Sequence, residues 1–210
     1  MEGEKAPLTP TYMEPIVKLI NYTPNPERII AAAARLCYSD KSGEDLFENL
    51  SDSEVEKLVR KIISLGHYSV LEHVSFTFAI SGISRVTTHQ LVRHRVGCSY
   101  SQRSQRYIEE DDFNYIIPPS IQERPELLKK YEETMNQLNG LYEEFAKVVP
   151  KEDARFLLPQ AIESKIMVTY SLRALLHFLE LRTCRRAQWE IQTLAWKMLK
   201  EAKKVAPLLF

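Results

Sequence analysis

Residues 93–107, with the sequence RHRVGCSYSQRSQRY, concentrate side chains that bind anions. The basic residue in this segment is arginine, whose planar guanidinium binds a phosphate or carboxylate through two parallel hydrogen bonds. The serines and glutamines between the arginines add neutral hydrogen-bond donors. No Asp, Glu or Lys occurs from His73 to Ile108, so the local field is strongly positive. The segment therefore predicts a site for a phosphate-bearing ligand.

Two other interpretations of this segment stay open from the residues alone. A charge run is commonly a solvated basic loop, and an arginine–serine mixture is also typical of RNA-binding tails. The interior position and the balance of 28 basic against 28 acidic residues argue against a tail. A preceding helix over residues 85–93 would place Gln90 on one face with Arg93 and His94, which favours a pocket over a loop.

A second polar stripe occurs in SLRALLHFLELR, residues 171–182. Leucines and a phenylalanine surround most of the circumference of this predicted helix, which indicates a buried element. Arg173, His177 and Glu180 form the remaining stripe. A buried arginine needs a partner, so we expect Arg173 to pair with Glu180, with another acidic residue or with a ligand. Arg155, in KEDARFLLP, raises the same question.

Several standard sites are absent from the sequence. Neither G-x-G-x-x-G nor G-x-x-x-x-G-K-[ST] occurs, so dinucleotide-binding and P-loop sites of the usual kind are unsupported. His67, His73, His89 and His94 lack metal-ligand spacing, so no metal is expected. Cys98 could be a thiolate activated by the surrounding positive charge or a small packing residue, and we favour packing.

The elements that must position these residues alternate between strands and helices, without a repeat. Asn25 with Pro26 predicts a helix start, while Ser51 with Glu54 forms a capping box ahead of a helix that Gly66 ends. This mixed order predicts an α+β fold, with a mixed or antiparallel sheet flanked by helices. We expect strands at 16–20, 74–81, 113–120 and 164–170, and further helices at 85–93, 124–149, 152–158, 171–181 and 187–204.

The whole chain has the composition of an ordinary globular protein. Its 210 residues fit one domain, 1–210. Cys37, Cys98 and Cys184 are an odd, widely spaced set, which favours a reduced cytoplasmic setting. The polar, proline-rich N-terminus does not resemble a signal peptide, and no run of 18 apolar residues occurs, so a membrane is not an expected partner. The balance of 28 basic and 28 acidic residues gives no general attraction to nucleic acid, which is not an expected partner either.

Taken together, the motifs resemble those of flavin-dependent thymidylate synthases, the thymidylate synthase-complementing type of fold. The family signature is Arg-His-Arg, seven residues and then Ser. Further stretches agree in order and spacing over most of the chain: GHYSVLEHVSFTF at 66–78, HQLVRHR at 89–95, ARFLLP at 154–159, and LRALLHFLELR with AQWEI at 172–191. This combination is far more specific than any single motif.

Three positions depart from the family pattern. Eight residues, not seven, separate Arg95 from Ser104, and we place the extra residue within 96–98. Arg103 therefore stands where a literal count puts the family serine. Ser171 occupies a position where related sequences have asparagine, and Arg186 one where they have histidine.

The resemblance implies the reductive methylation of dUMP to dTMP. 5,10-Methylenetetrahydrofolate would supply the carbon, FAD would carry the hydride and NADPH would reduce the flavin. The family assembles as a homotetramer with active sites between subunits. Two rival functions are a non-catalytic nucleotide- or RNA-binding module and another flavoenzyme with a phosphorylated substrate.

The resemblance also assigns roles to residues. Arg182, facing the uracil ring, and Ser104 would be the catalytic residues, and Cys98 would be dispensable. The predicted flavin residues are His67, Arg93, His94, Arg95, Arg173 and His177. The predicted nucleotide residues are Gln90, Gln102, Arg103, Ser104, Arg106, Arg155 and Arg182.

Overall fold

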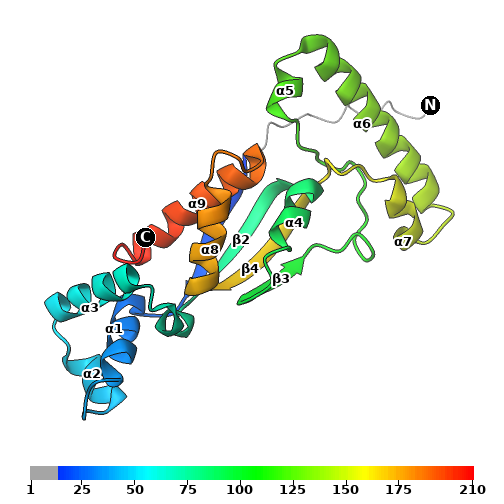
Figure 1. Ribbon diagram of the computed structural model, residues 1–210. Helices are drawn as coiled ribbons and strands as arrows, with labels where there is room; N and C mark the ends of the chain where they lie inside the picture. Colours follow the sequence, from blue (N-terminus) through cyan, green and yellow to red (C-terminus); the bar gives the residue numbers. More distant parts are fainter. Residues whose placement is uncertain (1–13) are drawn as a thin grey trace. The chain divides into compact units, whose positions relative to one another are not determined.

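The computed structural model describes residues 14–210, shown in Figure 1. The described chain forms two compact units, which we name after one helix of each. The α6 unit contains α6 (Pro125–Ala146) and is built from Ser81–Leu91 and Gln102–Ile166. The α8 unit contains α8 (Leu172–Arg182) and is built from Val17–Ile80, Val92–Ser101 and Met167–Phe210. A single domain over 1–210 stays a prediction.

Four strands form one sheet in the order β1-β2-β4-β3. The amide of Thr23, after β1, donates to the carbonyl of Ser75 at the start of β2. The amide of Ser171 donates to Gly97 while that of Arg103 donates to Lys165, so β3 and β4 also run in opposite directions. The α+β prediction is confirmed, whereas β3 was not expected. The strands are β1 (Ile16–Tyr22), β2 (Ser75–Ser84), β3 (Cys98–Gln102) and β4 (Glu163–Ser171).

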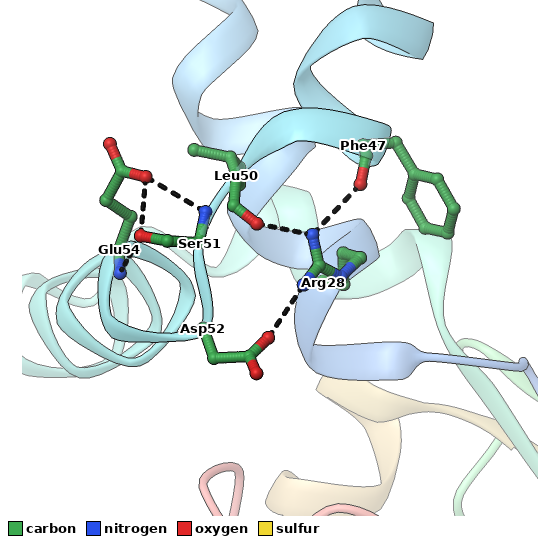
Figure 2. A network of polar contacts seen from close by, with 6 residues as sticks. All are labelled: Arg28, Phe47, Leu50, Ser51, Asp52 and Glu54. Carbon is green, nitrogen blue, oxygen red and sulfur yellow. Dashed lines mark hydrogen bonds and ion pairs between the residues drawn. The ribbon is translucent and has the colours of Figure 1, made fainter.

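Three helices at the start of the chain are joined by one arginine (Figure 2). They are α1 (Pro26–Leu36), α2 (Gly43–Asn49) and α3 (Asp52–Leu65), of which α2 was not predicted. Arg28 on α1 donates to the carbonyls of Phe47 and Leu50, at 3.1 and 2.6 Å. It also pairs with the Asp52 carboxylate at 2.7 Å. These contacts fasten the turn between α2 and α3 to α1.

The predicted start and end of α3 are confirmed. The Ser51 hydroxyl accepts from the Glu54 amide, and the Glu54 carboxylate accepts from the Ser51 amide (Figure 2). Gly66 ends the helix in the left-handed conformation, at φ 68°. Helix α1 begins at Pro26 as predicted, but the predicted capping role of Asn25 is wrong. Asn25 has φ 50°, and its side chain makes no capping hydrogen bond.

Two sequence-based boundaries fail because tertiary contacts override local patterns. Helix α4 spans Arg85–Leu91, so Arg93 and His94 lie beyond it and do not share a helical face with Gln90. The carbonyl of His94 instead accepts from the Tyr100 hydroxyl at 2.6 Å. Residues 113–120, predicted as a strand, make only one bridge, Tyr115 to Ile162.

Residues 113–117 instead line the core of the α6 unit. Phe113, Tyr115 and Ile117 pack with Met135 of α6. The carbonyl of Ile116 accepts from the Tyr131 hydroxyl at 2.9 Å. Prolines at 118 and 119 lack the amide hydrogens that a sheet ladder needs. The segment is therefore fixed by side-chain packing.

In the α8 unit, helix α8 packs against α9 (Trp189–Val205) and η1 (Tyr68–His73). Leu172, Leu175 and Phe178 are fully buried, but Leu181 is 47% exposed. Leu181 is thus an exception to the predicted apolar surface of α8, and Arg173 and His177 of the predicted polar stripe lie on an exposed face. The remaining short elements are α5 (Pro119–Gln122), α7 (Lys151–Ala154) and η2 (Arg155–Leu157). Over residues 14–210, none of the helices has the length and apolar character that crossing a bilayer requires.

Candidate functional site

The predicted site residues divide cleanly between the two units. The flavin residues and Arg182 all belong to the α8 unit, whereas the other nucleotide residues all belong to the α6 unit. Each group can therefore be described within one compact body.

A cavity of about 340 Å³ in the α8 unit gathers most of the predicted flavin residues. None of the described residues that line it is acidic. Its donors are guanidinium and imidazole groups, which suit the phosphates of a dinucleotide such as FAD, and Ala174 and Leu181 add apolar surface. The donor set therefore fits the expected cofactor. The lining residues are Arg93, His94, Arg95, Val96, Cys98, Ala174, His177, Leu181 and Arg182.

His94 and Arg182 are in direct contact in this cavity. The Nε–H of Arg182 donates to Nε2 of His94 at 3.0 Å. The His94 ring lies edge-on to Phe178, with centroids 5.1 Å apart, and to His177, at 6.3 Å. Burial, then the charge of Arg182, then His177 lower the pKa of His94 to about 4. His94 is therefore a neutral imidazole at physiological pH.

The loop that carries Arg93 to Arg95 is anchored to the start of α8 through Gly97. Gly97 has φ 69°, and its carbonyl accepts from the Ser171 amide at 2.8 Å. Ser171 caps α8, because its hydroxyl accepts from the Ala174 amide at 3.3 Å. A Cβ on Gly97 would lie 2.6 Å from that hydroxyl. The departure at Ser171 thus preserves a capping side chain.

Cys98 and Tyr100 follow in β3. Burial raises the pKa of the Cys98 thiol, which disfavours a thiolate and agrees with the packing role. The Tyr100 hydroxyl, already donating to His94, lies 3.1 Å from the Tyr170 hydroxyl. Burial raises the pKa of both tyrosines, so they serve as neutral hydrogen-bonding groups.

Arg173 and His67 lie outside this cavity. Arg173 pairs with the Glu72 carboxylate at 2.7 Å rather than with Glu180, and both partners are more than half exposed. Glu72 was missed, although it lies inside the matched GHYSVLEH stretch. His67 lines a different cavity of the α8 unit, about 350 Å³, together with Arg35 and Lys61.

In the α6 unit, Gln102 is held by two hydroxyls. Its side-chain amide donates to Ser164 at 2.8 Å and to Thr88 at 3.2 Å. Gln90, half-buried, is the penultimate residue of α4. The Ser104 hydroxyl accepts from the Arg106 amide at 3.2 Å, which shapes the turn carrying that arginine.

Two glutamates hold the predicted phosphate-binding arginines. Arg103 pairs with buried Glu110 at 3.2 Å, and burial raises the pKa of that carboxyl despite the arginine. Arg106 pairs with the Glu152 carboxylate, while the Arg155 guanidinium donates to the Glu152 carbonyl at 3.0 Å. Glu152 thus links Arg106 with Arg155. Sequence reasoning missed it, although it stands three residues before Arg155.

A further arginine, Arg85, was not singled out from the sequence. Burial, and then the charge of Arg155, lower the pKa of Arg85, whereas the charge of Glu110 raises it. The α6 unit thus concentrates arginines that an anionic ligand would neutralise. Over the described part of the chain, no group of three or more His, Cys, Asp or Glu side chains forms a metal-binding cluster.

Comparisons with known proteins bear on the family and the fold of this chain. The model of the family described as "Thymidylate synthase complementing protein" matches residues 18–208. A flavin-dependent thymidylate synthase of Clostridium tetani is 46% identical over 211 residues, covering 92% of this chain and 84% of the relative. One from Geobacter sulfurreducens is 49% identical, with the same coverage, and one from Pyrococcus furiosus is 49% identical, covering 90% of this chain and 79% of the relative.

A solved structure confirms the fold independently. The crystal structure of the UMP/dUMP methylase PolB from Streptomyces cacaoi, bound with 5-Br dUMP, superimposes with a TM-score of 0.84. It covers 96% of this chain and 95% of its own, at 24% identity. With the family model spanning nearly the whole chain and relatives close to half identical, this chain belongs to the thymidylate synthase complementing protein family.

Proposed function

We propose that this protein is a flavin-dependent thymidylate synthase that converts dUMP to dTMP, with 5,10-methylenetetrahydrofolate as carbon donor, FAD as hydride carrier and NADPH as reductant. Family membership and the names of the relatives support the reaction class. The observation that carries the proposal is that one chain contains both a group of predicted flavin residues and a group of predicted nucleotide residues. One lines a basic cavity, and the other is an arginine cluster suited to a phosphate.

The residues of the α6 unit would bind the nucleotide. Arg106 and Arg155, joined through Glu152, would bind its phosphate together with Arg103, and an incoming dianion would compete with the glutamate carboxylates for them. Gln90 and Gln102 supply neutral donors and acceptors for the sugar and base. Ser104 would contribute a hydroxyl beside the phosphate-binding turn.

The residues of the α8 unit would hold the flavin and assist the chemistry. FAD supplies hydride-transfer chemistry when bound. Arg93, Arg95 and His177 would hold it through charged and polar contacts, with Arg173 and His67 at its more distant parts. Arg182 would stabilise negative charge that develops on the pyrimidine oxygens. Following the family, we further propose a homotetramer with shared sites.

A product assay with single omissions tests this proposal. Purified protein with dUMP, methylenetetrahydrofolate, NADPH and FAD should form dTMP, and omitting any one should abolish or strongly reduce formation. Absence of dTMP from the complete mixture would contradict the proposal. Salt-sensitive binding to many oligonucleotides without flavin binding would instead support the RNA-binding alternative.

Replacing Arg106 with alanine should raise the KM for dUMP by about 10- to 100-fold, because a hydrogen bond to a charged group contributes about 1.5–3 kcal/mol. Flavin content should stay unchanged, since Arg106 lies in the other residue group. Steady-state kinetics with flavin absorbance measure both. Lys129→Ala is the matched control, because it removes an exposed cation from the same unit. An unchanged KM in Arg106→Ala would remove Arg106 from the phosphate site.

A further inference from the structure

The contact between His94 and Arg182 fixes the chemical state of the histidine. A guanidinium has only hydrogen-bond donors, so Nε2 of His94 must be the acceptor in the 3.0 Å contact and carries no proton. A neutral imidazole with an unprotonated Nε2 carries its proton on Nδ1. The residue is therefore in one defined tautomer.

The charged and polar surroundings of His94 all disfavour an imidazolium. Arg182 and His177 approach from α8, and both lower the pKa of His94. Arg93 and Arg95 flank it in its own loop, adding positive charge. Cys98 and Tyr100, on β3, have raised pKa values and contribute no negative charge at neutral pH.

His94 is held both at its ring and at its backbone. Phe178 lies edge-on to it at 5.1 Å, and the His94 carbonyl accepts from Tyr100 at 2.6 Å. Tyr100 is in turn 3.1 Å from the hydroxyl of fully buried Tyr170. Arg182 is the last residue of α8, where a long side chain would otherwise sample many rotamers. His94 is thus a rigid acceptor for a flexible arginine.

We propose that His94 is a positioning residue for Arg182: it engages the Nε–H and so directs the terminal N–H groups of the guanidinium to the pyrimidine. This inference rests on the proposed function and adds a second role to the expected flavin contact of His94. The terminal N–H groups form a separate edge of the guanidinium, so they stay available while Nε–H is engaged. The Nδ1–H of the same ring remains a donor at the cavity.

Two substitutions of His94 distinguish the contribution of its hydrogen-bond acceptor from that of its aromatic ring. His94→Phe retains the aromatic contact with Phe178 but has no acceptor, whereas His94→Gln retains an acceptor. At saturating FAD, His94→Phe should lower kcat by about 10- to 100-fold with little change in the KM for dUMP, the range expected for a hydrogen bond to a charged group. His94→Gln should recover most of that loss. Equal losses in the two variants would overturn the inference.

A double-mutant cycle tests whether His94 acts through Arg182. If it does, adding His94→Phe to Arg182→Ala should cost less than about threefold further in kcat, because the interaction is already lost. Multiplicative losses would overturn the inference while leaving dTMP formation by the wild type, and with it the proposed function, intact. An inactive wild type would instead contradict the proposed function.

A stability measurement gives a readout without turnover. The folded-state pKa of His94 lies below its ordinary value of 6.5, so the neutral ring contributes stability that is present above pH 6.5 and lost as pH falls through about 4. Thermal unfolding of the wild type should therefore lose stability relative to His94→Gln between pH 6.5 and 4. Parallel curves would show that His94 is not held neutral and would overturn the inference.

Discussion

Arg182→Ala should lower kcat by about 100- to 1,000-fold, the range seen when a preorganised donor to developing negative charge is removed. Flavin content should be largely retained, because Arg93, Arg95 and His177 still line the cavity. Steady-state turnover and the flavin absorbance of the purified variant measure the two effects separately. The expectation follows from the contact of Arg182 with His94, which engages the Nε–H of the guanidinium and leaves its terminal N–H groups available.

Arg185→Ala is the matched control for this experiment. Arg185 is exposed and lies just beyond α8, so its loss removes the same charge from the same end of the helix. It should leave turnover within about twofold, as surface substitutions usually do. Loss of flavin from Arg182→Ala, or an equal fall in turnover in Arg185→Ala, would contradict the role given to Arg182.

Gly97→Ala should be the most destabilising of the single changes considered. An alanine at φ 69° costs about 1–2 kcal/mol. Its Cβ would also meet the Ser171 hydroxyl at 2.6 Å and the Ala174 Cβ at 3.0 Å, and overpacking of this kind typically adds about 1–3 kcal/mol. Relief requires the loop to move away from α8, so flavin content should fall as well. Thermal or denaturant unfolding with flavin absorbance gives both quantities.

Gly66→Ala is the control that separates the two expected effects of Gly97→Ala, the strain of a positive φ and the steric clash of the added Cβ. Gly66 has φ 68°, nearly the angle of Gly97, but no described atom lies within 4 Å of its added Cβ. It should therefore show only the conformational cost and keep its flavin. Equal destabilisation in the two variants would mean that the approach of Gly97 to Ser171 does not constrain the loop.

The sequence predicts the ends of a helix correctly where the capping residues lie within a few positions of those ends. The capping box at Ser51 and Glu54, and the glycine at 66, are complete within a few residues, so the boundaries of α3 followed from the sequence. The end of α4 did not follow from the sequence, because the His94 carbonyl accepts a hydrogen bond from the hydroxyl of Tyr100, which lies on strand β3. The segment at 113–117 resembles a strand in composition, but its side chains pack against α6.

The resemblance names the residues of the candidate site, which stay a prediction, but it does not give their contacts. Arg173 was expected to pair with Glu180, with another acidic residue or with a ligand, and its partner is Glu72, 101 residues away in the chain. Arg182 and His94 are 88 residues apart, and no local pattern links them. Gly97 falls within 96–98, the segment to which the extra residue was assigned, and its positive φ lets the loop turn beside α8.

The most direct measurement of the central claim is the visible absorption spectrum of the purified protein with FAD, titrated with dUMP and, separately, with deoxyuridine. If FAD and dUMP bind in one functional site, the flavin absorption band should change in a saturable way as dUMP is added. Because the nucleoside lacks the phosphate that Arg106 and Arg155 would bind, deoxyuridine should need at least about tenfold higher concentration. A protein that binds no flavin, or a flavin band that is indifferent to dUMP, would contradict the account.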